Sequence, residues 1–390
     1  MRPMKPGSWV SPTALVTLAA LIAWMGGTAM SAPAGGASTA SPAPAGSRPA
    51  RSLAGATKPL RVVDAAGRAV ALNKPPRRIV VVGRAPFMSL HLLYMFPEAR
   101  QRLVGTEEKG GAASDFLPLV DAGFSRKAVL QGPGPEEVAA LHPDLVLIKN
   151  PALDPMGTAL SQVHIPVVYL GLETPDQFYR DVANLGVLLG DPVRAREIAD
   201  FYRTRIARIR RGWEGVPSGR KPRVLLLEYS DRGGTAAVRV PARPWMQTLE
   251  VQSAGGEPVW LEAAAITSGW TVTNIEQIAR WDPDQIVMVV WYTLDPAQVI
   301  AKLEADPQWG ALRAVKAGRI HAFPSDYYGW DSPDPRWILG LTWLAKVTYP
   351  DRFADLDMAE EVRQFFGTLY GMDRTSIDAN ILSRIHLDVR

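Results

Sequence analysis

The sequence of 390 residues contains no cysteine, and its first 58 positions contain no acidic residue. The missing cysteine excludes a disulfide framework, a thiolate metal site, a cysteine nucleophile and a lipid-modified amino-terminal cysteine. The sequence pI is near 9.2, but five of the 43 Lys and Arg residues lie in that acid-free segment, which leaves 38 bases facing 39 acids. A nucleic-acid-binding surface, which needs a basic surplus on the folded part, is therefore not predicted.

Motifs of common catalytic and cofactor sites are also missing. The sequence has no G-x-S-x-G, no G-x-x-x-x-G-K-[ST] and no H-E-x-x-H. Its five histidines show no paired spacing, so we predict neither a bare zinc or manganese site nor a resident cofactor. We expect a binding protein and not an enzyme; an exported enzyme or sensor is the alternative, because catalytic residues can come from distant positions.

The amino-terminal residues 1–31 have the pattern of a secretory signal, with a positive start and an apolar run over 14–25. This run is shorter than the ~20 residues that a membrane span needs, so we predict cleavage near 31–34, with a retained anchor as the alternative. Residues 32–58 are rich in Pro, Ala, Ser and Gly and predict a disordered tether. The mature protein is therefore expected in the periplasm, without a lipid anchor.

From residue 59 onward, short apolar runs alternate with amphipathic segments, which predicts an α/β architecture with parallel strands. The expected strands are 78–82, 144–148, 167–170, 223–227, 285–290 and 319–323. Asp191 and Pro192 predict the start of one long helix that reaches Trp213 and spans about 33 Å. The expected divisions are a first α/β lobe over 59–174, a helical segment over 175–213 that includes this helix, and a second α/β lobe over 222–390.

Two segments of the sequence repeat each other: EEVAALHPD over 136–144 and EQIARWDPD over 276–284. In each, a Glu stands seven residues before a Pro-Asp pair, and an apolar strand follows. The pattern predicts a short helix that ends before the proline, with the aspartate opening the turn into a buried strand. Duplication of one supersecondary unit predicts two similar lobes.

The order of these segments resembles the iron-complex and cobalamin family of periplasmic substrate-binding proteins, which serve ATP-driven ABC importers. The matching segments are VVDAAGRAVALNKPPRRIVVV over 62–82, RLVG over 102–105, both repeat units and VKAGRIHAF over 315–323. The resemblance covers most of the chain, from about residue 60 to residue 353. It implies two Rossmann-like α/β lobes bridged by a single long α-helix, with the ligand in a cleft between the lobes.

The resemblance also implies docking on a permease through one acidic residue in each lobe, at positions that Glu136 and Glu276 hold here. A carboxylate on each lobe can pair with a basic pocket on each half of a symmetric permease. The alternative is that both are ordinary carboxylates at helix amino termini, where the helix dipole stabilises them. Glu137 is a weaker candidate for the role of Glu136.

Ligands of open α/β sheets lie beyond the carboxyl ends of the strands. The basic and aromatic residues that follow the expected strands are Arg84, Lys149, Tyr229, Arg232, Trp291, Tyr292, Tyr328, Trp330 and Arg336. The cations suit an oxygen-rich anion, and the aromatic residues suit a large flat chelate. Their alternative roles are ion pairs and surface charges, loop packing and, for Arg336, a cap on the helix that follows.

Together these features predict an exported, monomeric receptor that captures a metal chelate and delivers it to an ABC permease and its ATPase. A ferric siderophore is the first candidate ligand, a corrinoid or haem is the next, and a molybdate-type oxyanion is a further alternative on the same fold.

Overall fold

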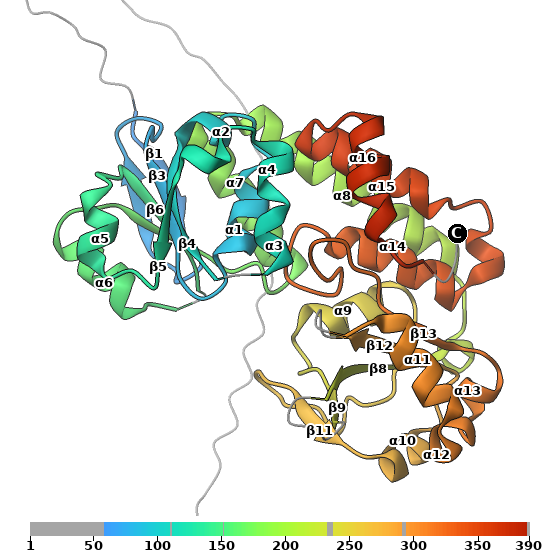
Figure 1. Cartoon of the computed structure of the whole chain (residues 1–390). Coiled ribbons are helices and arrows are strands. Elements are labelled where there is room, and N and C mark those ends of the chain that lie inside the picture. Colours follow the sequence, from blue (N-terminus) through green and yellow to red (C-terminus); the bar gives the residue numbers. More distant parts are fainter. Residues whose placement is uncertain (1–57, 110, 151, 232–236, 291–293, 388–390) are drawn as a thin grey trace, which may run out of the picture. The chain divides into compact units, whose positions relative to one another are not determined.

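The computed structural model describes residues 58–387, apart from 110, 151, 232–236 and 291–293 (Figure 1). The predicted signal over 1–31 and all but the last residue of the tether over 32–58 lie outside the described residues. None of the helices in the described part of the chain is long and apolar enough to cross a membrane.

The first sheet has five parallel strands in the order β5-β4-β3-β6-β7. Their bounds are β3 Ile79–Val82, β4 Leu103–Glu108, β5 Ala128–Gln131, β6 Leu145–Lys149 and β7 Val167–Leu170, and an antiparallel hairpin of β1 Leu60–Val63 and β2 Ala69–Leu72 precedes them. Every residue of β3, β7 and the first four positions of β6 is buried. Such continuous burial is what strands covered on both faces show.

Helices cover both faces of this sheet, and we call the sheet and these helices the first lobe (Figure 1). Their bounds are α1 Pro86–Leu93, α2 Ala99–Arg102, α3 Ala112–Asp115, α4 Leu117–Val120, α5 Pro135–Ala140, α6 Pro155–Gln162 and α7 Pro175–Leu189. Val80 and Val82 pack in one apolar cluster with residues of α5 and α6. Ile79 and Val81 point to the other face and join the main core with residues of α1 and α7.

The predicted long helix is α8, Pro192–Trp213, and it has the 22 residues that the sequence indicates. The side chain of Asp191 accepts a hydrogen bond from the amide of Arg194 at 2.9 Å, and Pro192 occupies the first turn. Ile198, Tyr202 and Ile209 are buried. Successive members of this set lie four and seven positions apart, which is about one and two helical turns, so they share the buried face of the helix.

The second sheet repeats the strand order of the first, as β11-β9-β8-β12-β13, with β10 beside β8. The second lobe consists of this sheet and its helices: β8 Arg223–Ser230, β9 Ala237–Val240, α9 Met246–Ser253, β10 Glu257–Pro258, β11 Thr271–Thr273, α10 Ile275–Trp281, β12 Gln285–Val290, α11 Pro296–Ala305, α12 Pro307–Gly310, α13 Arg313–Lys316 and β13 Ile320–Ala322. Unlike its counterpart β4, strand β9 is antiparallel to its neighbours. The expected strands thus exist, but β8 continues three residues beyond its predicted end.

The predicted repeat is visible in the backbone. His142 and Asp282 hold the same position in the two repeat units, and both have positive φ, 47° and 40°, in the left-handed region that few non-glycine residues adopt. The aspartate two positions later accepts main-chain hydrogen bonds in both lobes: Asp144 from the amide of Arg78 at 2.8 Å and Asp284 from the amide of Arg223 at 2.8 Å. The aspartate therefore opens the turn into the strand, as the sequence predicts.

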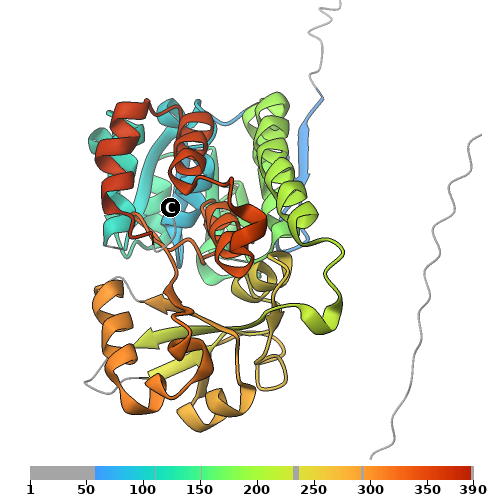
Figure 2. The same cartoon turned by 90° about the vertical axis from the view of Figure 1, so that its right-hand side faces the viewer.

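The last three helices, α14 Trp337–Thr348, α15 Met358–Tyr370 and α16 Arg374–Asn380, extend the packing back toward the start of the chain (Figure 2). The Phe116 ring lies 5.6 Å from the Phe366 ring and 5.0 Å from the Tyr370 ring, between centroids. The Tyr370 hydroxyl donates to the main-chain oxygen of His91 at 3.1 Å. The predicted second lobe over 222–390 follows chain order, whereas α15 packs on residues of the first lobe.

Candidate functional site

Arg84 follows the carboxyl end of β3, directly after Gly83. Gly83 has a φ of 108°, and a Cβ there would lie 2.9 Å from Cγ2 of Ile148, so this position requires glycine. The Gly83 amide donates to Glu107 Oε2 at 2.8 Å. These contacts fix the backbone before Arg84, whose side chain is exposed and has no polar partner within the described residues.

Lys149 ends β6, the strand beside β3, and Val82 lies opposite Ile148 in the register. Its ammonium forms an ion pair with Glu173, which lies beyond the end of β7. The Lys149 side chain is almost fully buried, so its charge is compensated within the fold. The sequence interpretation did not include Glu173.

Tyr328 lies in the loop over 324–336 between β13 and α14, and it meets the first lobe at Phe87. The two ring centroids are 4.7 Å apart. Burial raises the pKa of the Tyr328 hydroxyl above its ordinary value, and the nearby charges of Asp331, Asp334 and Glu173 add to this effect. We call the group that this brings together the ligand edge: Arg84, Phe87, Lys149, Glu173 and Tyr328.

Trp330 and Arg336 have no exposed surface, and both side chains point to Asp326. The Trp330 indole nitrogen donates to Asp326 Oδ2 at 3.0 Å, and Arg336 Nε donates to Asp326 Oδ1 at 2.7 Å. In this structure neither side chain faces a ligand, because both belong to the core. Arg336 stands just before α14, but no side-chain hydrogen bond caps that helix.

Tyr229 lies inside β8 and not after it, with 2% of its surface exposed. Lys302 Nζ donates to its hydroxyl oxygen at 3.3 Å. The sequence-based boundary of the strand was wrong here, and the correct boundary makes Tyr229 a core residue. The remaining candidates, Arg232, Trp291 and Tyr292, lie outside the described residues.

Glu136 and Glu276 occupy the first turns of α5 and α10, and both are exposed without a polar partner in the described part of the chain. Glu137 differs from Glu136, because its Oε2 accepts a hydrogen bond from the amide of Gly134 at 2.8 Å. In α10 the side chain of Asn274 caps the helix by accepting from the amide of Gln277. Capping therefore occupies Glu137 and Asn274 and leaves Glu136 and Glu276 available.

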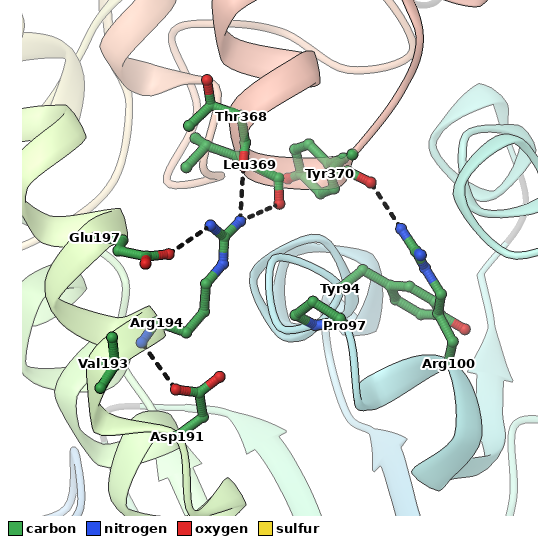
Figure 3. Close-up of a pocket in the computed structure, with 11 residues that line it drawn as sticks. Tyr94, Pro97, Arg100, Asp191, Val193, Arg194, Glu197, Thr368, Leu369 and Tyr370 are labelled. Carbon is green, nitrogen blue, oxygen red and sulfur yellow. Dashed lines mark hydrogen bonds and ion pairs between the residues drawn. The ribbon is translucent and has the colours of Figure 1, made fainter.

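A separate cavity of about 380 Å³ lies where α8, α15 and the end of α1 meet (Figure 3). Arg194 Nη2 donates to the main-chain oxygens of Thr368 and Leu369 at 2.9 and 2.8 Å, and Arg100 Nη2 donates to that of Tyr370 at 2.7 Å. These carbonyls end α15 and have no partner within the helix. The two arginines therefore cap α15, and the cavity walls are structural.

Residues 126–327 match the model of a family described as periplasmic binding protein. This match spans more than half of the chain. The chain belongs to the periplasmic binding protein family. The match confirms the family that the order of the sequence segments predicted.

Two relatives of this periplasmic binding protein are similar to it over part of their length. The molybdate-binding protein MolA of Haemophilus influenzae is 27% identical over 264 residues, which cover 60% of this chain and 69% of that protein. The vitamin B12-binding protein of Pectobacterium carotovorum is 27% identical over 180 residues, which cover 45% of this chain and 61% of that protein.

Solved structures share the fold of this periplasmic binding protein at low identity. A periplasmic solute-binding protein of Veillonella parvula has a TM-score of 0.65 and 23% identity, and the match covers 84% of this chain and 98% of the other. Molybdate-bound MolA of H. influenzae has a TM-score of 0.64 and 20% identity, covering 80% and 98%.

Three residues with buried side chains around Arg336 have signals in the sequence that our interpretation did not use. His91 is an ionisable residue inside the apolar run LHLLYMF, and such residues are buried only when they have partners. Asp334 and Asp326 flank the aromatic segment that was singled out. Within the described residues, no group of three or more His, Asp or Glu side chains could hold a metal ion.

Proposed function

We propose that this protein is the receptor of an ABC importer and captures an anionic metal compound at the ligand edge. Arg84 carries the proposal, because it is exposed at the carboxyl end of a central strand and has no polar partner among the residues that the structure describes. The neighbouring cations differ from it, since Lys109 pairs with Glu107 and Lys149 with Glu173. A free guanidinium is a planar donor for the oxygens of a carboxylate, catecholate or metal oxyanion.

Two members of this ligand class have specific support. A molybdate-type oxyanion is supported by the relative named for molybdate, with 27% identity over 264 residues. A ferric siderophore is supported by the Phe87 and Tyr328 rings, which offer an apolar surface beside Arg84. A corrinoid or haem, suggested in part by the vitamin B12-binding relative, needs the aromatic surface more than the cation.

The ligand is tested by titrating the purified protein with sodium molybdate, a ferric siderophore and cyanocobalamin in a calorimeter, beside native mass spectrometry of the protein from its own cells. For an anionic ligand, Arg84→Gln is expected to weaken binding about tenfold or more, equal to about 1.4 kcal/mol. Arg126→Gln is the matched control, because Arg126 is also exposed on the first lobe and its side chain has no polar partner among the described residues. Unchanged affinity in Arg84→Gln would refute the role of Arg84.

The partner is proposed to be a two-halved permease with its ATPase, contacted by Glu136 and Glu276. Both carboxylates are exposed, lie at equivalent positions of the repeat and form no ion pair within the described ranges of the chain. The variant Glu136→Lys/Glu276→Lys is expected to abolish uptake and leave ligand affinity within about twofold, since neither residue belongs to the ligand edge. The control is Glu214→Lys/Glu304→Lys, which reverses two other exposed carboxylates; equal loss of uptake in both variants would contradict specific docking.

The protein is proposed to act as a periplasmic monomer after removal of residues 1–31. Amino-terminal sequencing of the protein from cells distinguishes a cleaved signal from a retained anchor, and light scattering gives the oligomeric state. An exported enzyme on the same scaffold would instead convert its bound compound, which mass spectrometry of the ligand before and after incubation detects.

A further inference from the structure

Helix α1 meets the loop over 324–336 at two places. At the ligand edge, the Phe87 ring contacts the Tyr328 ring. One turn further along α1, His91 Nδ1 lies 2.5 Å from Asp334 Oδ2 and 3.0 Å from Arg336 Nη1. The same short helix therefore carries a ligand-edge contact and a buried polar contact to the same loop.

The polar contact belongs to a group of four side chains, which we call the junction cluster: His91, Asp326, Asp334 and Arg336. None of the four side chains has exposed surface. Arg336 joins the two carboxylates, because Nε donates to Asp326 Oδ1 at 2.7 Å and Nη1 donates to Asp334 Oδ1 at 3.0 Å. His91 is the only member from the first lobe.

The ring of His91 makes contacts through both of its nitrogens. Nδ1 lies 2.5 Å from Asp334 Oδ2 and 3.0 Å from Arg336 Nη1, and Nε2 lies 3.2 Å from the main-chain oxygen of Ala113. These contacts join α1 to the loop over 324–336 on one side and to α3 on the other.

Asp334 is the ionised partner in this pair. Burial alone would raise the pKa of its carboxyl, but the charges of His91 and Arg336 and their hydrogen bonds hold that pKa below its ordinary value. Arg336, which pairs with both carboxylates, and the hydrogen bonds within the cluster offset the cost of burying these groups.

Among the described residues, the other neighbours of His91 are aromatic side chains. Its ring faces Phe116 at 5.2 Å, Phe87 at 6.3 Å and Tyr328 at 6.5 Å between centroids, and the Tyr370 hydroxyl binds its main-chain oxygen. The Arg336 guanidinium lies 4.4 Å from the Phe116 ring centroid. Aromatic side chains from α4, α15 and the loop thus exclude water from the cluster.

We propose that His91 is a positioning residue of the ligand site: its contacts in the junction cluster fix α1 against the loop over 324–336 and so hold Arg84, Phe87 and Tyr328 in one arrangement. The effect of this contact on ligand affinity rests on the proposed function.

The positioning role is tested by the distance between spin labels on the two lobes, and the absence of native cysteine makes the labelling specific. The labels go on Ala140→Cys and Arg280→Cys, exposed and equivalent positions of the repeat. His91→Gln is expected to broaden the distance distribution. The control Lys127→Gln, which breaks a buried ion pair within the first lobe, is expected to leave it unchanged; no broadening in His91→Gln refutes the role.

The ligand arm uses sodium molybdate in a calorimeter. Affinity is expected to fall about tenfold in His91→Gln and to stay within about twofold in Lys127→Gln. Wild-type protein that does not bind molybdate counts against the oxyanion and not against the junction cluster, because the distance measured without ligand decides the latter. Normal molybdate affinity in His91→Gln would refute the link between the cluster and the ligand edge.

Discussion

The two lobes share a strand order and a repeated helix–turn–strand unit, but they differ after their central strands. In the first lobe β3 is followed by Gly83 and the exposed Arg84, whereas the register places Glu228 and the buried Tyr229 at the equivalent positions of β8. Glu228 pairs with Arg239 at 2.7 Å. The repeated units thus supply the scaffold and the proposed docking carboxylates. The segments that are not repeated give the two lobes different side chains after their central strands.

Burial of charge also differs between the lobes. In the first lobe Asp121 accepts from Tyr94 at 2.7 Å and lies 3.3 Å from the Lys127 ammonium. On the side of the second lobe Asp331 is buried and accepts a hydrogen bond from the amide of Gln247 at 3.1 Å. Glu250 nearby is buried and its pKa is raised well above the ordinary value, by burial first and by Asp331 second. Asp121 is therefore compensated by a cation, whereas no cation pairs with Asp331 or Glu250 in the described part of the chain.

The largest expected effect comes from the junction between the lobes. Arg336→Leu removes the guanidinium that pairs with both Asp326 and Asp334, and losing one partner of a buried pair costs about 3–5 kcal/mol. Urea unfolding of the ligand-free protein measures the loss. Arg203→Leu breaks an exposed pair on α8 and should cost less than about 1 kcal/mol; similar losses would mean that the cluster contributes little.

The next effect tests whether the repeat units are energetically equivalent. Asp144→Ala and Asp284→Ala each remove a carboxylate that accepts main-chain hydrogen bonds, and each should cost about 1.5–3 kcal/mol. Thermal unfolding of the two variants should give similar losses. A large loss in only one lobe would show that the repeat is a matter of shape and not of stability.

Acid should erase the effect of Asp284→Ala. Burial acts to raise the pKa of Asp284, but the Arg223 amide and the Arg313 guanidinium bring it below the ordinary value. The stability from Asp284 is therefore present above its unfolded pKa and is lost as the pH falls through the lower, folded pKa. The difference between wild type and variant in the free energy of unfolding should shrink below about pH 4; a constant difference would contradict this origin.

Opposite signs are expected for the two buried acids. Burial raises the pKa of Asp331 to about 6, so ionisation costs stability as the pH rises from its unfolded pKa toward 6. Asp331→Asn should gain about 1–3 kcal/mol at pH 7.5 and little at pH 4, because a one-unit shift equals about 1.4 kcal/mol. Asp121→Asn should lose stability at pH 7.5, since its carboxyl pKa is lowered despite its burial. Melting temperatures at both pH values decide; a loss in Asp331→Asn would break the contrast.

The smallest effect separates capping from docking. Glu137→Ala should lose about 0.5–1.5 kcal/mol and Asn274→Ala about 1 kcal/mol, because each removes a hydrogen bond that caps its helix. Glu136→Ala and Glu276→Ala should stay within about 0.5 kcal/mol of wild type. If Glu136→Ala were as damaging as Glu137→Ala, the first docking carboxylate would be structural.

The sequence predicted the parts of the molecule in which local pattern decides structure. Helix α8 was found from Asp191 and Pro192 at its start, and the strand Gln285–Val290 from its continuous apolar run. The short strands β9 and β11 were not predicted, because pairing of β9 with β8 and of β11 with β9, and not local pattern, makes them strands. The family membership inferred from the order of segments is confirmed by the match over 126–327.

The candidate site was less predictable, because exposure depends on tertiary neighbours. Arg84 and Arg336 look alike in the sequence, each a basic residue after an expected strand. One is exposed and the other is completely buried between two aspartates. Only the fold brings Asp326 and His91 to Arg336, and no spacing rule relates residues that lie 245 positions apart.

The contact between Tyr370 and His91 spans 279 positions of the chain. In a chain that emerges amino end first, the apolar surface around Phe116 stays open until α15 has been synthesised, because Phe366 and Tyr370 complete its packing. Early segments of such a chain reach their final core only with its last tenth or so of length. This late completion of the first lobe fits the export that we propose, in which the chain would cross a membrane before it folds.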